Sequence, residues 1–436
     1  MTRTPKGRSR DLPAIHPQRV ELSDEVHARP PAELDGAQRI SYVAMVCDPG
    51  QHAGQWSVLR KLVSSHGHEL PVEPQGHLLM DLGRFRARYE RHNEFSRLMI
   101  IADGAGVPFK HPAIALLPEG WLARLPGELI MAAHVEVVAA RPGRGRYDEL
   151  ARRYFGGNVL VGAAVSGGAA TVMTDFRIHD DGFSRILTQN HSATPRQAGR
   201  VVQRMLEIDT YRMMALLTFP AARKLGPGLS RSESELSLIA DAMAHETPES
   251  ETDLLARLLK LEAEIESRYA ESQFRFGAAA AYYELVRQRI EDLREERLPG
   301  LQMISEFMER RLAPAMATCR SAERRLENLS ERISRATQLL STRIDAARQK
   351  QNQDLLATMA RRAKLQLRLQ QTVEGLSVAA ITYYLVGIIG YAAKGLSSSG
   401  VPLKAEIVTG ASIPFVLAAV ALGIRRIRRI MGLHKE

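Results

Sequence analysis

Apolar positions in the N-terminal half of the chain recur with the short period of β-strands. Six such runs, separated by turn residues, lie at 40–46, 77–82, 96–101, 129–138, 159–165 and 171–178. Helical spacing is indicated near 55–65 and 145–154, and most strongly at 195–217. This mixture predicts an α+β (or α/β) domain. Between two of the runs, residues 165–169 read Val-Ser-Gly-Gly-Ala, which predicts a tight hairpin turn.

From about residue 249 to 371 glycine and proline are almost absent, and the apolar positions change to a helical period. Spacings of four and three residues recur, as in Leu254, Leu258, Leu261 and Ile265 and again over 326–340. This seam predicts long helices that pack as a coiled coil. Pro299-Gly300 predicts a break between two segments, and Pro314 a kink near the start of the second. The second segment continues without another break signal into the apolar region that follows.

Two runs near the C-terminus, 376–393 and 407–424, each contain 18 residues without a charge. At 1.5 Å per residue, a helix of roughly 20 apolar residues crosses the hydrocarbon of a bilayer. The two runs therefore predict a hairpin of two transmembrane helices. A buried helical hairpin in a soluble protein is the alternative.

The charges that flank these runs predict how the hairpin is oriented. Basic residues precede the first run and follow the second: Arg361, Arg362, Lys364, Arg368, Arg425, Arg426, Arg428 and Arg429. The intervening loop carries only Lys394, Lys404 and Glu406. Because cytoplasmic flanks carry the excess of Lys and Arg, we expect both termini in the cytoplasm. In a bacterium this corresponds to the inner (plasma) membrane, with the lipid bilayer as one partner.

Small residues inside the two runs indicate close contacts between helices, and they favour self-association of the chain into a homo-oligomer. Ordinary use of glycine in membrane helices is the alternative. If several copies surrounded a pore, its lining would come from the first run. The candidate lining residues are Ser377, Thr382, Tyr383, Gly387 and Gly390.

Together these patterns divide the 436 residues into four regions. We expect an extended N-terminal segment at 1–37, a cytosolic α/β domain at 38–228, a helical stalk at 229–372, and a transmembrane hairpin with a basic tail at 373–436. Lys and Arg outnumber Asp and Glu by 59 to 49, a net charge of +10, which fits a basic cytoplasmic side. The basic residues are scattered among acids along helices, so no nucleic acid partner is expected.

Three polar clusters, at 25–30, 88–95 and 175–183, are candidate ligand or metal sites. Their carboxylates and imidazoles suit a divalent cation, and the residues singled out are Glu25, His27, Glu90, His92, His179 and Asp180. The alternative is that 179–182 is only a turn and that the alternating Glu, Arg and His form two faces of a sheet. The absence of a spacing such as HExxH favours this alternative. Cys47 and Cys319 lie far apart, which fits a reducing compartment without structural zinc.

Enzyme signatures are missing from the sequence. It contains no GxxxxGK[ST], no GxSxG and no GxGxxG, and residues 104–106 (Gly-Ala-Gly) lack the remainder of a dinucleotide fingerprint. We therefore do not expect an enzyme.

Three segments carry a resemblance to a known family. They are HPQRVELSDEVHARP (16–30), YERHNEF (89–95) and QQTVEGLSVAAITYYLVGIIGYAAKGL (370–396). These stretches resemble a bacterial family of uncharacterised membrane-anchored proteins over essentially the whole chain. The family pattern has Thr between the His and Glu of the second segment, where this chain has Asn93. The resemblance implies a membrane anchor and brings no assigned activity.

The layout alone is also similar to that of CorA-type magnesium channels, which implies a homo-oligomer and a pore. Those channels end their first span with Gly-Met-Asn, whereas this chain has Gly390-Tyr391-Ala392-Ala393-Lys394. Lys394 at a pore mouth would repel cations. Two functions remain as hypotheses: a membrane-anchored scaffold or sensor whose cytosolic domain binds a ligand or partner, and a CorA-like channel or transporter.

Overall fold

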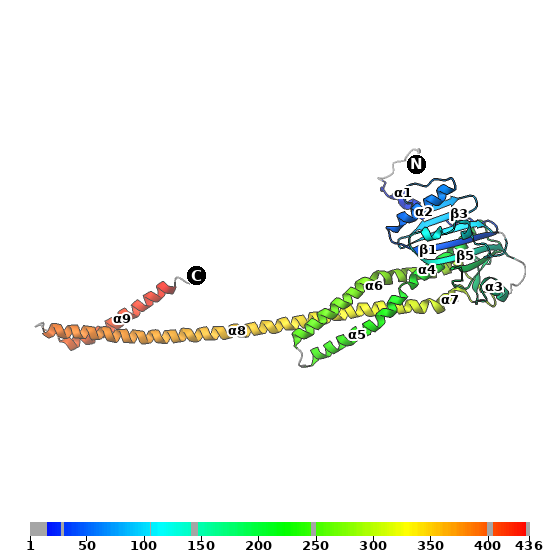
Figure 1. The fold of residues 1–436 in the computed structure, drawn as a ribbon. Helices are drawn as coiled ribbons and strands as arrows, with labels where there is room; N and C mark the ends of the chain where they lie inside the picture. The colour runs from blue at the N-terminus through cyan, green and yellow to red at the C-terminus, as the bar shows by residue number, and fades with distance from the viewer. Residues whose placement is uncertain are drawn as a thin grey trace. The chain divides into compact units, whose positions relative to one another are not determined.

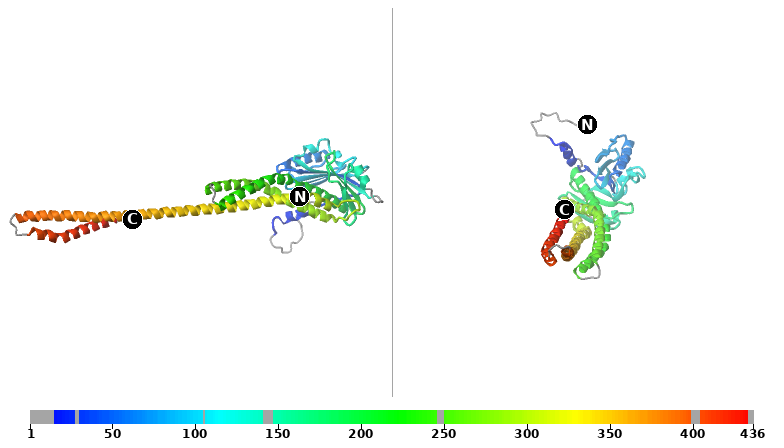
Figure 2. Two further views of the ribbon diagram at one scale, coloured as in Figure 1. Left: turned by 90° about the horizontal axis from the view of Figure 1, so that it is seen from below. Right: turned by 90° about the vertical axis from the view of Figure 1, so that its left-hand side faces the viewer.

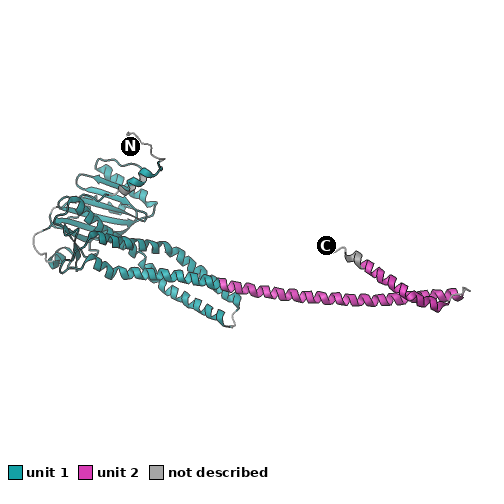
Figure 3. Cartoon of the chain, turned by 180° about the vertical axis from the view of Figure 1, so that it is seen from behind, with its two compact units in different colours: residues 1–337 teal, residues 338–436 magenta. Residues whose placement is uncertain are grey.

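The computed structural model describes residues 15–27, 30–104, 106–140, 147–245, 250–398 and 404–432; for Glu21, 25–27 and 428–432 it describes the backbone only. By contacts within the chain, these residues form two compact units, 1–337 and 338–436 (Figure 3). Each unit is described by itself below. One helix, α8 (Ala313–Ser398), contributes residues to both.

An eight-stranded mixed sheet organises the first unit (Figure 1). Its strands are β1 (Gln38–Val46), β2 (His77–Asp81), β3 (Arg86–Arg91), β4 (Phe95–Asp103), β5 (Glu128–Ala139), β6 (Val161–Val165), β7 (Ala170–Thr174) and β8 (Ser184–Asn190). The order across the sheet is β2-β3-β4-β1-β5-β8-β7-β6. Every neighbouring pair is antiparallel except β5 and β8, which run parallel. The predicted mixture of strands and helices is thus an α+β domain.

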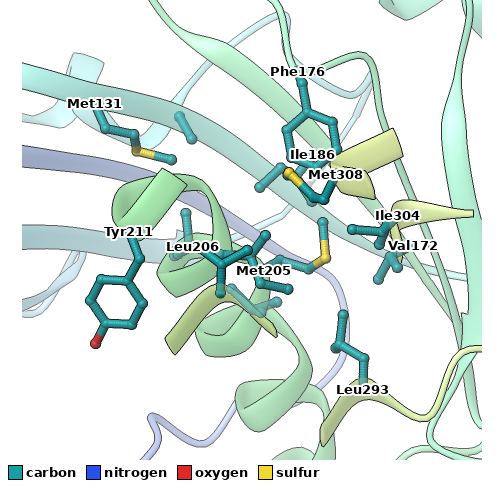
Figure 4. Close-up of a cluster of buried hydrophobic side chains, with 14 of the residues drawn as sticks. Met131, Val172, Phe176, Ile186, Met205, Leu206, Tyr211, Leu293, Ile304 and Met308 are labelled. Atoms are coloured by element: carbon teal, nitrogen blue, oxygen red, sulfur yellow. The ribbon is translucent and has the colours of Figure 1, made fainter. Parts of the chain in front are cut away.

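One face of the sheet packs on helices α4 (Pro195–Leu216), α6 (Glu251–Leu293) and α7 (Ile304–Arg311). Alternate residues of β1, namely Ile40, Tyr42 and Ala44, point to this side because successive side chains of a strand face opposite ways. The core between the layers is formed by large apolar side chains from both, including Met205 and Leu206 of α4 (Figure 4). The first turns of α8 add Met316 and Cys319 to the same cluster.

The opposite face is covered by shorter elements. Val43 and Met45 of β1 pack with Trp56, Leu59 and the rest of α2 (Gln51–Ser65). The short 3-10 helices η1 (Ala113–Leu116) and η2 (Leu122–Arg124) lie in the connection before β5, and α3 (Tyr147–Tyr154) packs against β7 and β8. Covering both faces leaves the central strands almost fully buried, as β1 shows, in which only Arg39 and Val46 are partly exposed.

The break predicted at Pro299-Gly300 is present and covers a sheet edge. Residues 294–303 separate α6 from α7, and their backbone pairs with β6: Ala164 N donates to Glu296 O at 3.0 Å and Gly162 N to Gln302 O at 2.9 Å. A covered edge strand has no free row of donors and acceptors for another chain. The connection between the long helices therefore also closes the sheet on this side.

After the last strand, which ends at Asn190, the described part of the chain is mainly helical. The helices are α4, α5 (Phe219–Ala244), α6, α7, α8 and α9 (Ala405–Gly432). The predicted long helices are present, and within the first unit Leu254, Leu258 and Leu261 of α6 and Leu326 and Leu329 of α8 are all buried. Pro314 lies at the start of α8, which then continues to Ser398.

Two helical stretches are long and apolar enough to cross a bilayer, judged by length and composition. One lies in the helix that ends at Ser398, and the other is Ala405–Ile427. Only 11% of the apolar window of the first and none of the second is buried. In the second unit α9 turns back beside the end of α8 (Figure 2), and Gly390 there lies against Thr409.

The sequence located six strands and missed two. The missed strands are β3, whose residues Arg86–Arg91 are mostly charged, and β8. The hairpin turn at 166–168 is confirmed, with positive φ at Ser166, Gly167 and Gly168. Within 1–37, expected to be extended, residues Arg19–His27 form the helix α1.

Candidate functional site

The segment 88–95, one of the three that carry the family resemblance, lies at the boundary between the sheet and its helices. Arg88 and Glu90 belong to β3, and Phe95 starts β4. The segment therefore includes the end of β3, a turn and the start of β4. The charged residues face α4 and α6 because alternate side chains of β3 and β4 point to that side of the sheet.

Five charged residues form what we call the sheet–helix ion network: Arg88, Glu90, Arg97, Glu207 and Arg289. Glu90 accepts hydrogen bonds from Arg88 Nε at 2.5 Å and from Arg97 Nε at 2.6 Å. Arg97 of β4 also contacts Glu207 of α4 at 3.3 Å, and Arg289 of α6 donates to the other oxygen of Glu207. The side chains of Glu90 and Glu207 are only 1% and 5% exposed. One continuous set of charges thus joins two strands to two helices.

Burial and the neighbouring positive charges shift the pKa values of the two glutamates of the network in opposite directions. Burial alone would raise the pKa of Glu90, but His92, Arg97 and Arg88 outweigh it and hold the pKa far below its usual range. Burial likewise opposes the charge of Glu207, and Arg97, Gln203 and Arg289 lower its pKa overall. Both carboxylates are therefore ionised at neutral pH. Burial raises the pKa of the neighbouring Tyr42 to about 12, so its hydroxyl stays neutral.

A second contact from the same segment reaches α6. Glu94 accepts hydrogen bonds from Arg275 Nη1 at 2.6 Å and from the hydroxyl of Tyr282 at 2.8 Å. His92 stacks on Phe95 with 4.4 Å between ring centroids, and Phe95 in turn meets Tyr211 and Tyr282 edge-on. Residues 88–95 therefore connect the sheet to the helices through both charged and aromatic contacts.

The candidate metal ligands do not converge. Glu90 and His92 lie 3.8 Å apart at β3, while His179 pairs with Asp175 at 3.0 Å beyond the end of β7, and Asp180 is exposed. Between β3 and β8 in the sheet lie β4, β1 and β5, so the two clusters are separate. The side chains of Glu25 and His27 lie outside the described residues. Among the described residues, no group of three His, Cys, Asp or Glu is placed to hold a metal ion.

A Ser-His-Asp arrangement occurs on the opposite face of the sheet. Its three residues are far apart in the chain, so no local sequence pattern predicts it. Ser41 Oγ lies 2.9 Å from His134 Nδ1, and His134 Nε2 lies 3.9 Å from Asp181 Oδ2. Ser41 is 1% exposed and accepts a hydrogen bond from the backbone of Ile114 in η1. Because η1 covers the hydroxyl, a substrate has no access to it. We interpret this group as structural.

The hollows beside these groups are small or open. The space lined by Tyr42, Arg88, Glu90 and Arg97 measures about 10 Å³, which is at most one water. A hollow of about 450 Å³ over Ile114–Leu122 is of ligand size and open to solvent. It is lined mainly by apolar residues, among them Leu117 and Trp121.

The candidate pore residues belong to the second unit. Thr382 is 7% exposed and donates to Val378 O, whereas Tyr383 is 77% exposed. Ser377 donates to Val373 O at 2.9 Å, and Gly390 lies against Thr409. Thr382 and Gly390 therefore face α9 in a single copy of the chain.

Replacing Glu207 by Gln should destabilise the protein by about 3–5 kcal/mol, because Arg97 and Arg289 would keep their charges without the shared carboxylate. The control is Glu284→Gln, which removes an exposed pair with Arg287 and should cost less than about 0.5 kcal/mol. Thermal unfolding of the two purified variants measures the difference. Equal losses of stability would show that the network contributes no more than a surface ion pair.

His134 should make the protein less stable as the pH falls from about 6.5 towards 4. Burial lowers the pKa of His134 to about 4, with Asp181 opposing and Arg185 assisting. Between these values the unfolded chain binds a proton that the folded chain does not, so stability rises with pH. The difference in unfolding free energy between wild type and His134→Gln should therefore shrink on going from pH 7 to pH 5. A difference that stays constant over this range would contradict a neutral buried imidazole.

The comparisons with known proteins identify the family to which the chain is similar, but no individual protein. The model of the family described as "Protein of unknown function (DUF3422)" matches residues 14–431. The comparisons with curated proteins and with solved structures found no match. Neither the family model nor the comparison with solved structures supports the likeness in layout to CorA-type magnesium channels. Because the match extends over nearly the whole sequence, the chain belongs to this family of unknown function, and the resemblance to an uncharacterised family is confirmed.

Proposed function

We propose that this chain is a membrane-anchored protein of a bacterial inner membrane, whose cytosolic α+β domain binds a ligand or a partner. The ends of α8 and α9 would form the anchor. The observation that carries the proposal is the uncovered apolar surface of these two helices. Leu376 is 75%, Phe415 77% and Leu422 64% exposed in the isolated chain.

The exposure of these side chains distinguishes the anchor from a core hairpin of a soluble protein. A core helix would bury its apolar residues inside the chain, and each large side chain so buried contributes about 1.5–3 kcal/mol. Here the chain itself covers almost none of the two apolar windows. Lipid would cover all of them, because a transmembrane helix presents its apolar side chains to hydrocarbon.

The Ser and Thr hydroxyls of the hairpin are also satisfied in a way that suits lipid. In hydrocarbon every hydroxyl must find a partner within the protein. Thr382 donates to Val378 O at 2.7 Å, Thr409 to Ala405 O at 2.8 Å, and Ser412 to Thr409 O at 2.7 Å. Gly390 permits close approach of the helices, since a Cβ there would lie 3.1 Å from Thr409 Oγ1.

The flanking charges support an orientation with both termini in the cytoplasm. Arg361, Arg362 and Arg368 precede the first apolar stretch, and Arg425 and Arg426 follow the second. Arg428 and Arg429 continue the basic tail, with side chains outside the described residues. Because basic flanks stay on the cytoplasmic side, the sheet domain would lie in the cytosol and Ser398 near the outer surface.

The cytosolic domain would supply the recognition surface. The charges of the sheet–helix ion network are engaged with one another, and the Ser-His-Asp group is covered, so neither offers a reaction centre. The open apolar hollow over Ile114–Leu122 is the place where a ligand or an apolar side chain of a partner would fit. Recognition without chemistry is the function that these features favour.

Accessibility of single cysteines tests the orientation. Ser398→Cys should react with a membrane-impermeant maleimide in intact spheroplasts, because the proposal places it outside. Thr358→Cys, on the same helix and exposed, is the matched control and should react only after lysis. The native Cys47 and Cys319 are buried, so the unchanged chain gives the background. Protection of both positions until lysis would overturn the proposed orientation.

A further inference from the structure

Ile344 is the last buried residue of α8 before the apolar stretch that begins at Leu376. Between the two, α8 is uncovered on every side. All residues from Asp345 to Val373 are exposed. A single helix in water gains little stability of its own, so most of the stability of helices in proteins comes from packing an apolar face. This segment carries such a face without a described element to cover it.

The uncovered face has the spacing of a coiled coil. Starting at Leu355, positions separated by four and three residues in alternation form a stripe, which we call the α8 stripe: Leu355, Met359, Arg362, Gln366, Leu369, Val373, Leu376 and Ala380. The large apolar members are 55–75% exposed, from Leu355 at 55% to Leu376 at 75%. In the heptad notation these are the a and d positions, with Met359, Gln366, Val373 and Ala380 at a.

Apart from Arg362, which belongs to the stripe, the charges on this part of the helix lie away from it. Arg361 and Arg368 take the c positions and Lys364 an f position, all of which point away from the stripe. The e and g positions beside the stripe carry no charge from Leu356 to Thr372. Two parallel copies would therefore meet through apolar faces without like charges at their margins.

Arg362 and Gln366 interrupt the apolar stripe at its centre. Both side chains can still lie at a contact between two copies of α8. Each is long enough to lay its aliphatic part over the contact and keep its polar end in water. Polar residues at isolated core positions fix the register of a coiled coil at some cost in stability. In an aligned pair Gln366 would lie opposite its own copy, while the two Arg362 guanidinium groups, which repel each other, would extend outward into water.

The stripe continues into the apolar stretch on the side away from α9. Thr382, Gly390 and Ala393 face α9, whereas Tyr384 and Tyr391 are 70% and 79% exposed. With 3.6 residues per turn, Tyr384 and Tyr391 follow Val373 and Leu376 on the same side of the helix. A single face of α8 is thus uncovered over about 55 Å, from Leu355 to Tyr391.

We infer that the α8 stripe is the interface with a second copy of this chain, paired in parallel and in register. The inference rests on the proposed membrane anchor. A soluble partner can cover the stalk part of the stripe but not the part in lipid, and lipid can cover only the latter. A second copy, anchored by its own hairpin in the same orientation, covers both.

Disulfide cross-linking of single cysteines in native membranes tests the interface. Leu355→Cys and Val373→Cys place a thiol on the stripe, and in a parallel, aligned pair each thiol lies opposite its own copy. Ala357→Cys and Gln371→Cys are matched controls, two residues away at the outward f positions. Under mild oxidation the stripe variants should form covalent dimers at least several-fold faster than the controls.

The outcomes separate this inference from the proposed function. Equal cross-linking of both faces, or none, in a chain that still floats with the membranes would overturn the interface and leave the anchor intact. A chain that does not float with membranes would overturn the anchor itself. Dimers from the stripe variants alone, with the unchanged chain monomeric on the same gel, would support the inference.

Discussion

Most of what can be concluded about this protein depends on the need to cover the apolar surface of its last two helices. In the isolated chain Leu376, Phe415 and Leu422 face solvent, although removing each of these side chains from water would lower the free energy. The chain provides no core for them, since α9 covers only one side of the end of α8. In the proposed arrangement a bilayer would cover the outer sides, and a second copy would cover the side that continues beyond it. The proposed anchor and the inferred interface are therefore two parts of one explanation.

The first unit depends on a different interaction. Its sheet is joined to α4 and α6 through charges that are almost inaccessible to water, and each carboxylate of the network is shared by two arginines. Removing one member would leave an unpaired buried charge, which costs far more than a surface pair gains. This explains why Arg88 and Glu90 of the segment 88–95 are buried although they are charged. These residues hold the domain together and are not free to bind a cation.

The sequence predicted the elements whose pattern is local. The apolar runs at 129–138 and 40–46, the helix at 195–217 and the break at Pro299-Gly300 follow from the period of a few neighbouring residues. Strand β3 was missed because its alternation is of Arg and Glu with Ala and Tyr, and the buried polar side needs partners from distant elements. Glu207 and Arg289 lie more than a hundred residues from Glu90, so no local pattern joins them. The grouping of His134 with Ser41 and Asp181 likewise depends on strand register, which the sequence alone did not fix.

The central claim, that the chain is an integral membrane protein, is tested most directly by alkaline carbonate extraction of membranes from cells that produce the full chain. Carbonate strips proteins held by surface charge and leaves those whose helices cross the hydrocarbon. The account predicts that the full chain remains in the membrane pellet after extraction. Release of the chain into the supernatant would contradict the anchor and require another cover for α9 and the end of α8.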